Sequence, residues 1–241
     1  MGDTVRFSRV LLKISGEMLG GKAGFGLETE TLDYIAREIK SVHDLGVGIA
    51  VVIGGGNFIR GSAFSETGGI DRTVADHMGM MGTIMNSLAL QSAIEKQGIP
   101  CRVQSAITVS EVAEPFIRRR AIRHLEKGRV VVFAAGTGNP YFTTDTAAVL
   151  RALEIDAQAL LKATKVDGVY DKDPNKHADA VKFESLSFSD AIDRRLAVMD
   201  QTAFTMCREH GMPLVVLDLL REGGMARAVL GQKEGTLVHG G

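Results

Sequence analysis

Hydrophobic residues along the chain form two kinds of pattern, which predict strands and helices in alternation. Short apolar runs without polar alternation predict strands buried on both faces of a parallel sheet. These runs cover residues 10–15, 48–57, 101–105, 130–133, 157–162, 213–218 and 236–239. Helical patterns lie between the strands and cover residues 32–45, 72–97, 116–126, 146–153, 189–195, 200–209 and 224–230. The alternation predicts an α/β protein built on a parallel sheet.

The region 129–145 combines a buried strand, a polar loop and the start of a helix. Glycine, proline and residues with hydroxyl or amide groups make up the loop: Gly136, Thr137, Gly138, Asn139, Pro140, Thr143 and Thr144. Thr144 or Asp145 is expected to cap the following helix, so that free N–H groups and the positive end of the helix dipole face the loop. Ligands of open α/β sheets bind at such positions.

A second glycine-rich loop ends the predicted strand at 48–57. Without Cβ atoms, Gly54, Gly55 and Gly56 allow close approach of a ligand and turn N–H groups toward an anion. Arg60 lies within reach of the same anion. A dinucleotide-binding fingerprint is disfavoured, because Ile59 replaces its third glycine and no strand ends where its acidic residue belongs.

The first strand contains a lysine and leads into a third glycine-rich segment. Lys13 interrupts an apolar run, which suits either an edge-strand lysine reaching solvent or a lysine with a partner in a site. Gly21 and Lys22 match part of a phosphate-binding P-loop, but Ala23 stands where a hydroxyl should hold Mg²⁺. We therefore predict a flexible glycine loop.

The long helix at 72–97 leaves two pairs of interpretations open. Three methionines and two glycines share its spacing: Met78, Met81, Met85, Gly79 and Gly82. They suit either contact with a helix of another subunit or simple packing in the core. Asp76 is either an N-terminal charge favoured by the helix dipole or a carboxylate that accepts hydrogen bonds from ribose hydroxyls.

Two further segments are rich in charged residues, and each allows a functional and a purely structural interpretation. The helix at 116–126 carries four arginines, which form a solvated face or bind an effector phosphate at a subunit junction. Residues 163–175 predict a tight hairpin with Asp167 and Gly168 as its turn. The segment resembles the start of an EF-hand, but Lys176 and Lys182 occupy the positions of its glycine and glutamate, so calcium is not expected.

Length, charge and cysteine usage narrow the class of protein. At 241 residues and 45% hydrophobic content, we predict one domain spanning residues 1–241. A net charge of −1 with interspersed signs argues against nucleic acid and membranes as partners. No export signal or apolar run of ~20 residues is present, and Cys101 and Cys207 suit reduced thiols, so we expect a cytoplasmic protein. The scattered histidines predict no structural zinc.

The candidate chemistry is phosphoryl transfer. Lys13 and Lys162 at strand ends, Asp145 and the glycine-rich loops are expected to converge on one crevice. Such a set positions two phosphate-bearing ligands and stabilises charge, and it needs no general base if the acceptor is already a phosphate oxyanion. Mg²⁺ is expected to arrive on the donor, bridging its β and γ oxygens, so no protein metal site is predicted.

Several motifs together resemble the bacterial uridylate kinases of the amino-acid kinase superfamily. They are KISGE at 13–17, GFG at 24–26, VVIGGGNFIRG at 51–61, DHMGM at 76–80, AAGTGNPYFTTD at 134–145 and LKATKVDGVYDKDP at 161–174. The resemblance covers essentially the whole chain and ends with EGTLV at 234–238. The superfamily shares the first lysine and the glycine triplet, whereas GTGNPYFTTD together with DHMGM is specific to the uridylate branch.

This resemblance implies ATP-dependent conversion of UMP to UDP in pyrimidine nucleotide biosynthesis, with Mg²⁺, on an open three-layer α/β/α fold with a mainly parallel twisted sheet. It also implies a homohexamer activated by GTP and inhibited by UTP. The segment corresponding to GTP activation in some relatives comprises Gly21, Lys22, Ala23, Gly24, Phe25 and Gly26. The N-terminal part would mainly hold the acceptor, and the C-terminal part mainly ATP.

The resemblance also implies roles for individual residues. ATP is expected at Lys13, Ile14, Ser15, Gly16, Gly56, Arg60, Thr164, Tyr170 and Asp173. UMP is expected at Gly55, Asp76, Thr137, Gly138, Asn139, Pro140, Tyr141, Phe142, Thr143 and Thr144. Lys13 and Lys162 would stabilise the phosphoryl group during transfer, and Asp145 would orient them.

Two other functions remain open from the sequence. A carboxylate kinase of the same superfamily, acting on an amino acid, is disfavoured by the threonine-rich loop at 137–144. A non-catalytic nucleotide or oxyanion binder is disfavoured by the presence of Lys13, Lys162 and Asp145 together.

Overall fold

The computed structural model describes residues 4–59, 69–196 and 198–240, and nine strands among them form one sheet. The strands are β1 (Arg9–Ile14), β2 (Gly48–Ile53), β3 (Cys101–Ser105), β4 (Glu114–Pro115), β5 (Val130–Ala134), β6 (Ala159–Thr164), β7 (Ser185–Leu186), β8 (Leu214–Asp218) and β9 (Thr236–Val238). Their order across the sheet is β4-β3-β5-β2-β1-β6-β8-β9-β7. Every neighbouring pair is parallel except β8 and β9. The predicted mainly parallel sheet is confirmed.

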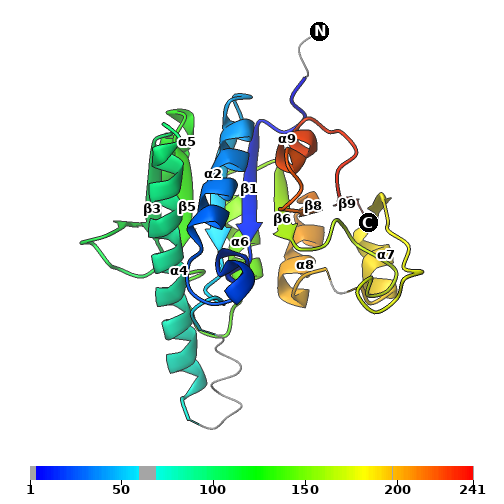
Figure 1. Ribbon diagram of the computed structural model, residues 1–241, viewed down its shortest axis with the longest axis horizontal. Helices are drawn as coiled ribbons and strands as arrows, with labels where there is room; N and C mark the ends of the chain where they lie inside the picture. The colour runs from blue at the N-terminus through cyan, green and yellow to red at the C-terminus, as the bar shows by residue number, and fades with distance from the viewer. Residues whose placement is uncertain (1–3, 60–68, 197, 241) are drawn as a thin grey trace.

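Helices cover both faces of this sheet (Figure 1). One face carries α2 (Thr29–His43), α4 (Arg72–Lys96) and α9 (Gly224–Val229), and the other carries α5 (Arg118–Glu126), α6 (Thr144–Glu154), α7 (Phe188–Asp193) and α8 (Gln201–Glu209). Each helical layer packs on the sheet through its own hydrophobic core. The three-layer α/β/α arrangement implied by the resemblance is therefore present.

Strand β1 shows why the apolar runs lack polar alternation. Leu11 and Leu12 are both fully buried, but they belong to the two different cores because successive side chains point to opposite faces. Burial of a leucine side chain stabilises the fold by about 1.5–3 kcal/mol. Lys13, the next residue, is only 9% exposed although it is charged. The edge-strand interpretation of Lys13 is wrong, because β1 lies in the middle of the sheet.

The predicted hairpin at 163–175 is not formed. Strand β6 already pairs with β1 on one side and with β8 on the other, so the chain that follows cannot fold back onto it. Tyr170 instead forms an antiparallel bridge with Lys182. Asp167 and Gly168 suit the turn of a hairpin, but both edges of β6 are already paired with other strands, which excludes one.

Local helical turns were also missed in the segment predicted as a flexible glycine loop. A short helix α1 (Gly16–Leu19) and a 3₁₀ turn η1 (Gly21–Ala23) follow β1 directly. The end of the segment is hydrogen-bonded back to α1, because the Glu28 N–H donates to the Leu19 carbonyl over 2.7 Å. The glycines therefore form an ordered connection.

The exposed face of α4 distinguishes between the two interpretations of its methionines. Met81 and Met85 are 47% and 45% exposed, so a role in the core is wrong for these two. The four arginines of α5 are exposed as well, as expected for a solvated face. Within the three described ranges, no helix has both the length and the apolar character required to span a bilayer.

The loops after β1 and β2 touch through glycine. A Cβ atom at Gly16 would lie 2.3 Å from the Gly54 carbonyl oxygen and 2.7 Å from the Gly56 nitrogen. Both neighbouring atoms belong to the backbone, so they cannot yield without moving the glycine triplet. Close packing of these two loops therefore requires glycine at position 16.

Replacing Gly16 with alanine tests this contact. We expect the free energy of unfolding to fall by about 1–3 kcal/mol, the usual cost of overpacking, although alanine is the better helix former in α1. Gly69→Ala is the control, because no atom of the described residues lies within 4 Å of the added Cβ, and it should change stability by less than about 0.5 kcal/mol. Equilibrium urea unfolding measures both variants, and equal stability of the two would contradict the close approach.

Candidate functional site

The candidate site lies where the neighbouring strands β5, β2, β1 and β6 end. These strands are parallel, so their carboxyl ends meet at one edge of the sheet. From β1 the chain proceeds to β2 on one side, whereas β6 pairs with β1 on the other side. A crevice at such a change of direction is the usual ligand site of an open α/β sheet.

Two buried lysines and one aspartate meet at this edge. Lys13 and Lys162 are directly paired across β1 and β6, so their side chains project from the same face. Like charges in such a pair repel each other. The Asp145 carboxylate, in the first turn of α6, bridges them, with Oδ1 2.6 Å from Lys13 Nζ and Oδ2 2.7 Å from Lys162 Nζ. The expected convergence of the three side chains is confirmed.

Charge interactions set the protonation states of this triad. Burial alone would raise the pKa of Asp145, but the Lys13 and Lys162 ammonium groups outweigh it and hold that pKa below its usual range. Burial lowers the pKa of Lys162, and the Lys13 charge adds to this effect against the attraction of Asp145. Two lysines against one carboxylate give the triad a formal charge of +1, which suits a phosphoryl oxyanion.

The position of Asp145 depends on helix caps. Thr143, rather than Thr144 or Asp145, caps α6, and its hydroxyl oxygen accepts hydrogen bonds from the Asp145 and Thr146 backbone N–H groups. The Thr143 hydroxyl donates to the carboxylate of Asp200, which itself caps α8. Asp200 also accepts a bond from the Thr146 hydroxyl at 3.1 Å. The first turns of α6 and α8 are thus tied together behind the triad.

One cavity of about 400 Å³ lies between α4 and the loop after β5. Seven residues predicted for UMP line it: Gly55, Asp76, Thr137, Asn139, Phe142, Thr143 and Thr144. The other three predicted residues of this loop, Gly138, Pro140 and Tyr141, do not line the cavity. Thr144, which lines this cavity, precedes Asp145 directly in the first turn of α6.

Eight of the fifteen residues that line this cavity were not predicted to bind UMP. The additional residues are Ile59, Arg72, Ala75, Gly79, Met80, Thr83, Ala135 and Gly136. Most of them belong to α4 and recur at helical spacing on the face that contains Asp76, which is the signal that could have found them.

Asp76 is held in place from two sides. The Arg72 Nε–H group contacts both carboxylate oxygens, at 2.9 and 3.0 Å, and the Tyr141 backbone N–H donates to Oδ2 over 2.8 Å. Asp71 caps the helix, so Asp76 lies in its second turn and is not the N-terminal charge considered above. Its role toward a ribose stays a prediction.

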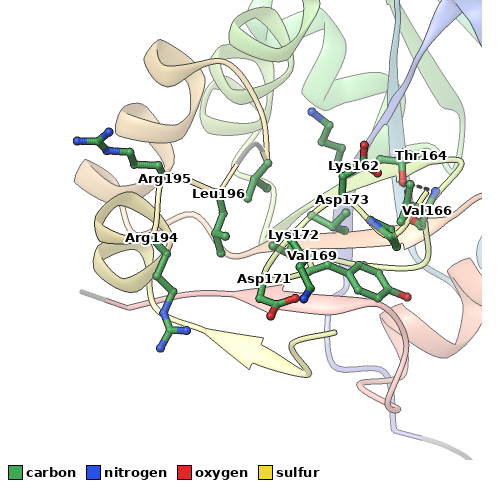
Figure 2. A pocket seen from close by; sticks show the side chains of 15 residues that line it. Lys162, Thr164, Val166, Val169, Asp171, Lys172, Asp173, Arg194, Arg195 and Leu196 are labelled. Carbon is green, nitrogen blue, oxygen red and sulfur yellow. Dashed lines mark hydrogen bonds between the residues drawn. The ribbon is translucent and has the colours of Figure 1, made fainter. Parts of the chain in front are cut away.

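A second cavity has a volume of about 550 Å³ (Figure 2). Lys162 lines it together with three residues predicted for ATP, namely Thr164, Tyr170 and Asp173. Figure 2 shows Arg194 and Arg195 directed away from Lys162 and Thr164. The sequence analysis missed an apolar part of the lining that consists of Val166, Val169, Leu196, Val198 and Val216. Apolar side chains of this kind suit the faces of a nucleobase.

The remaining residues predicted for ATP do not line this cavity. Lys13 to Gly16 lie at the end of β1, and Gly56 lies in the glycine triplet beside Glu17. Arg60 lies outside the described residues. The 21–26 segment joins the triplet through Asn57, whose side-chain amide donates to the Gly26 carbonyl over 2.7 Å.

A protein-bound metal has no ready set of ligands in the described ranges. No three His, Cys, Asp or Glu side chains come together there in an arrangement that could hold an ion. Both oxygens of Asp145 are engaged by ammonium groups.

Comparisons with known proteins show which family the chain resembles. The model of the amino acid kinase family matches residues 8–218. The chain is 57% identical to the uridylate kinase of Paramagnetospirillum magneticum, with 99% of each chain covered, and 54% identical to that of Dichelobacter nodosus, with 97% of each covered. The solved UMP kinase of Bacillus anthracis superimposes with a TM-score of 0.93 at 40% identity, covering 97% of this chain and 96% of that one.

Replacing Asp145 with asparagine tests the electrostatics of the triad. At pH 7 we expect the free energy of unfolding to fall by about 3–5 kcal/mol, because two buried ammonium groups lose their counter-charge. The pKa of Asp145 is lowered in the folded state, so its contribution is present above 3.8, the usual value, and is lost as the pH falls through the folded value. The difference between wild type and variant should therefore shrink in acid.

Urea unfolding at a series of pH values measures this difference. Asp156→Asn serves as the control, because Asp156 pairs with Arg118 in an exposed ion pair that contributes little. A difference for Asp145→Asn that is small at pH 7 or independent of pH would contradict the assigned electrostatics.

Proposed function

The chain belongs to the amino acid kinase family, in its uridylate kinase branch, and we propose that it transfers the γ-phosphoryl group of ATP directly to the phosphate of UMP. The observation that carries this proposal is the Lys13–Asp145–Lys162 triad beside two cavities of nucleotide size. Lys162 lines the larger cavity, and Thr144, the residue before Asp145, lines the smaller one. The cavity of about 550 Å³ would hold ATP, and the cavity of about 400 Å³ would hold UMP.

In the proposed reaction the two lysines stabilise charge while the phosphoryl group moves. The bond between the γ-phosphorus and the β,γ-bridging oxygen breaks, and a bond forms between this phosphorus and an oxygen of the UMP phosphate. Lys13 and Lys162 donate hydrogen bonds to the oxygens of the transferred group, where charge stabilisation contributes most. The acceptor oxygen is already deprotonated at neutral pH, so no general base is required.

Asp145 has a positioning role in this proposal. Its carboxylate keeps two ammonium groups close together that would otherwise separate, and its lowered pKa keeps it ionised at neutral pH. Mg²⁺ is the proposed cofactor, and when bound with ATP it would neutralise charge on the donor phosphates. The engagement of both Asp145 oxygens supports delivery of the ion by the nucleotide.

The proposed contacts to the nucleotides follow the two linings. Gly55, Asp76 and residues 137–144 would bind UMP, with the Asp76 carboxylate on the ribose, which its anchorage by Arg72 supports. Thr164, Tyr170 and Asp173 would bind ATP with the β1 end at residues 13–16, Gly56 and Arg60.

The proposal extends to assembly and regulation. The exposed face of α4, with Val74, Met81 and Met85, supports contact with another copy in a homohexamer. The connection of residues 21–26 to the glycine triplet through Asn57 supports a response to GTP. Inhibition by UTP is proposed with it, from the family resemblance alone. One continuous sheet supports a single domain over residues 1–241. The two buried free cysteines support a cytoplasmic location. The proposed conversion of UMP to UDP places the protein in pyrimidine nucleotide biosynthesis.

A substrate panel tests the proposed function. With ATP and Mg²⁺, we expect coupled ADP release with UMP and none with aspartate or acetylglutamate. Turnover with an amino acid alone would favour a carboxylate kinase, and the absence of all turnover would favour a non-catalytic binder. Either result would contradict the proposal.

Lys162→Ala tests the role of the second lysine. We expect kcat to fall by ~100-fold or more while UMP still binds, on the scale of a lost oxyanion stabiliser. Lys233→Ala is the control, because Lys233 pairs with the exposed Glu184 at 2.9 Å and lines neither of the two cavities. Steady-state kinetics and UMP titration calorimetry measure the two effects, and unchanged turnover of Lys162→Ala would contradict the assignment.

A further inference from the structure

Helix α4 carries two buried polar side chains, one turn apart, that hydrogen-bond outside the helix. Thr83 is 3% exposed and Asn86 is fully buried. Polar groups in such surroundings destabilise a protein unless they are hydrogen-bonded. Each of these side chains bonds to a different loop of the site, so their contacts bear on the arrangement of the site as well as on the helix.

Thr83 holds the start of the loop that lines the smaller cavity. Its hydroxyl oxygen accepts a hydrogen bond from the Ala135 backbone N–H at 2.7 Å, and the hydroxyl donates to the Met80 carbonyl within α4, also at 2.7 Å. Ala135 is the first residue after β5 and is fully buried. Its N–H group therefore depends on the threonine for its partner.

The backbone at Ala135 is in an unfavourable conformation. Its φ is 63°, in the left-handed region, which L-residues other than glycine rarely adopt. Such a residue persists only where its surroundings hold it in place. The turn at Ala135 determines the course of Gly136 and the residues after it around the cavity. The hydrogen bond that the Ala135 N–H donates to Thr83 therefore influences the position of the whole loop.

Asn86 holds the glycine triplet on the opposite side. Its side-chain amide donates to the Gly54 carbonyl over 2.7 Å and to the Asn57 side-chain oxygen over 2.7 Å, and Asn57 donates back over 2.9 Å. The helix itself packs directly on the triplet, since a Cβ at Gly55 would lie 3.2 Å from the Thr83 nitrogen. One face of α4 thus fixes both loops relative to each other.

We propose that Thr83 is a positioning residue for the phosphoryl acceptor, acting through the N–H group of Ala135. This inference rests on the proposed binding of UMP in the smaller cavity. Thr83 and Ala135 both line that cavity, and neither lines the larger one proposed for ATP. Loss of the hydroxyl leaves a buried N–H unpaired, which is more costly than loss of the bond itself. The loop must then shift, and acceptor binding should weaken selectively.

Thr83→Val tests the proposal because it removes the hydroxyl and keeps the shape of the side chain. We expect KM and the calorimetric Kd for UMP to rise at least tenfold, and KM for ATP to stay within twofold of wild type. Thr83→Ser retains the hydroxyl and should restore UMP binding to within about threefold.

The chain offers a matched control one turn further along α4. The Ser87 hydroxyl is also fully buried, but it donates to the Thr83 carbonyl inside the helix at 2.7 Å. Ser87→Ala removes a buried hydroxyl from the same helix without touching a loop, and it should leave KM for UMP unchanged.

Amide hydrogen exchange gives a readout that does not depend on activity. The Ala135 amide should exchange at least tenfold faster in Thr83→Val than in wild type, and it should stay protected in Thr83→Ser. If Thr83→Val does not fold, Thr83→Ala removes the same hydroxyl without placing a methyl group against Ala135, and the same results are expected.

The outcomes separate this inference from the proposed function. Wild-type protein that does not turn over UMP would contradict the proposed function. Wild-type turnover with an unchanged KM for UMP in Thr83→Val would contradict only the positioning role. Equal loss in Thr83→Val and Thr83→Ser, or an equal rise in KM for both nucleotides, would show a structural role and also overturn the inference.

Discussion

The structure of the site depends on one carboxylate between two ammonium groups. Lys13 of β1 and Lys162 of β6 are directly opposite each other in the sheet. The pairing of these two strands therefore brings two ammonium groups close together. Two buried like charges would destabilise the centre of the sheet, and Asp145 offsets this by ion pairing with both. Asp145 therefore offsets the repulsion between the two lysines. One of the two positive charges stays uncompensated and, in the proposed function, is available to a phosphoryl group.

The surrounding elements hold this carboxylate and align the two cavities beside it. Thr143 and Asp200 connect the first turns of α6 and α8, which fixes the position of Asp145 in the first turn of α6. On the other face of the sheet, α4 contacts the glycine triplet and the loop after β5 through buried polar side chains. The two cavities that we propose for donor and acceptor are thus attached to one arrangement of strands and helices, which would suit in-line transfer.

Much of this arrangement could be predicted from the sequence, and the failures have physical reasons. Unbroken apolar runs located the central strands because those strands are buried on both faces. The prediction of a hairpin after β6 was wrong because it rested on turn residues such as Asp167 and Gly168. These residues carry no information on the order of strands in the sheet. Glycine-rich motifs located the loops of the site. The α4 lining was missed because Ala75, Gly79 and Thr83 have the composition of ordinary helix packing.

The central claim is that both ammonium groups of the triad face the phosphoryl group in transfer. A crystal structure of the protein with UMP, ADP, Mg²⁺ and aluminium fluoride as a planar mimic of that group tests the claim directly. The account predicts Lys13 Nζ and Lys162 Nζ each within hydrogen-bond distance of the mimic, about 2.7–3.1 Å. A mimic that contacts neither lysine, or one that lies outside the gap between the two cavities, would contradict it.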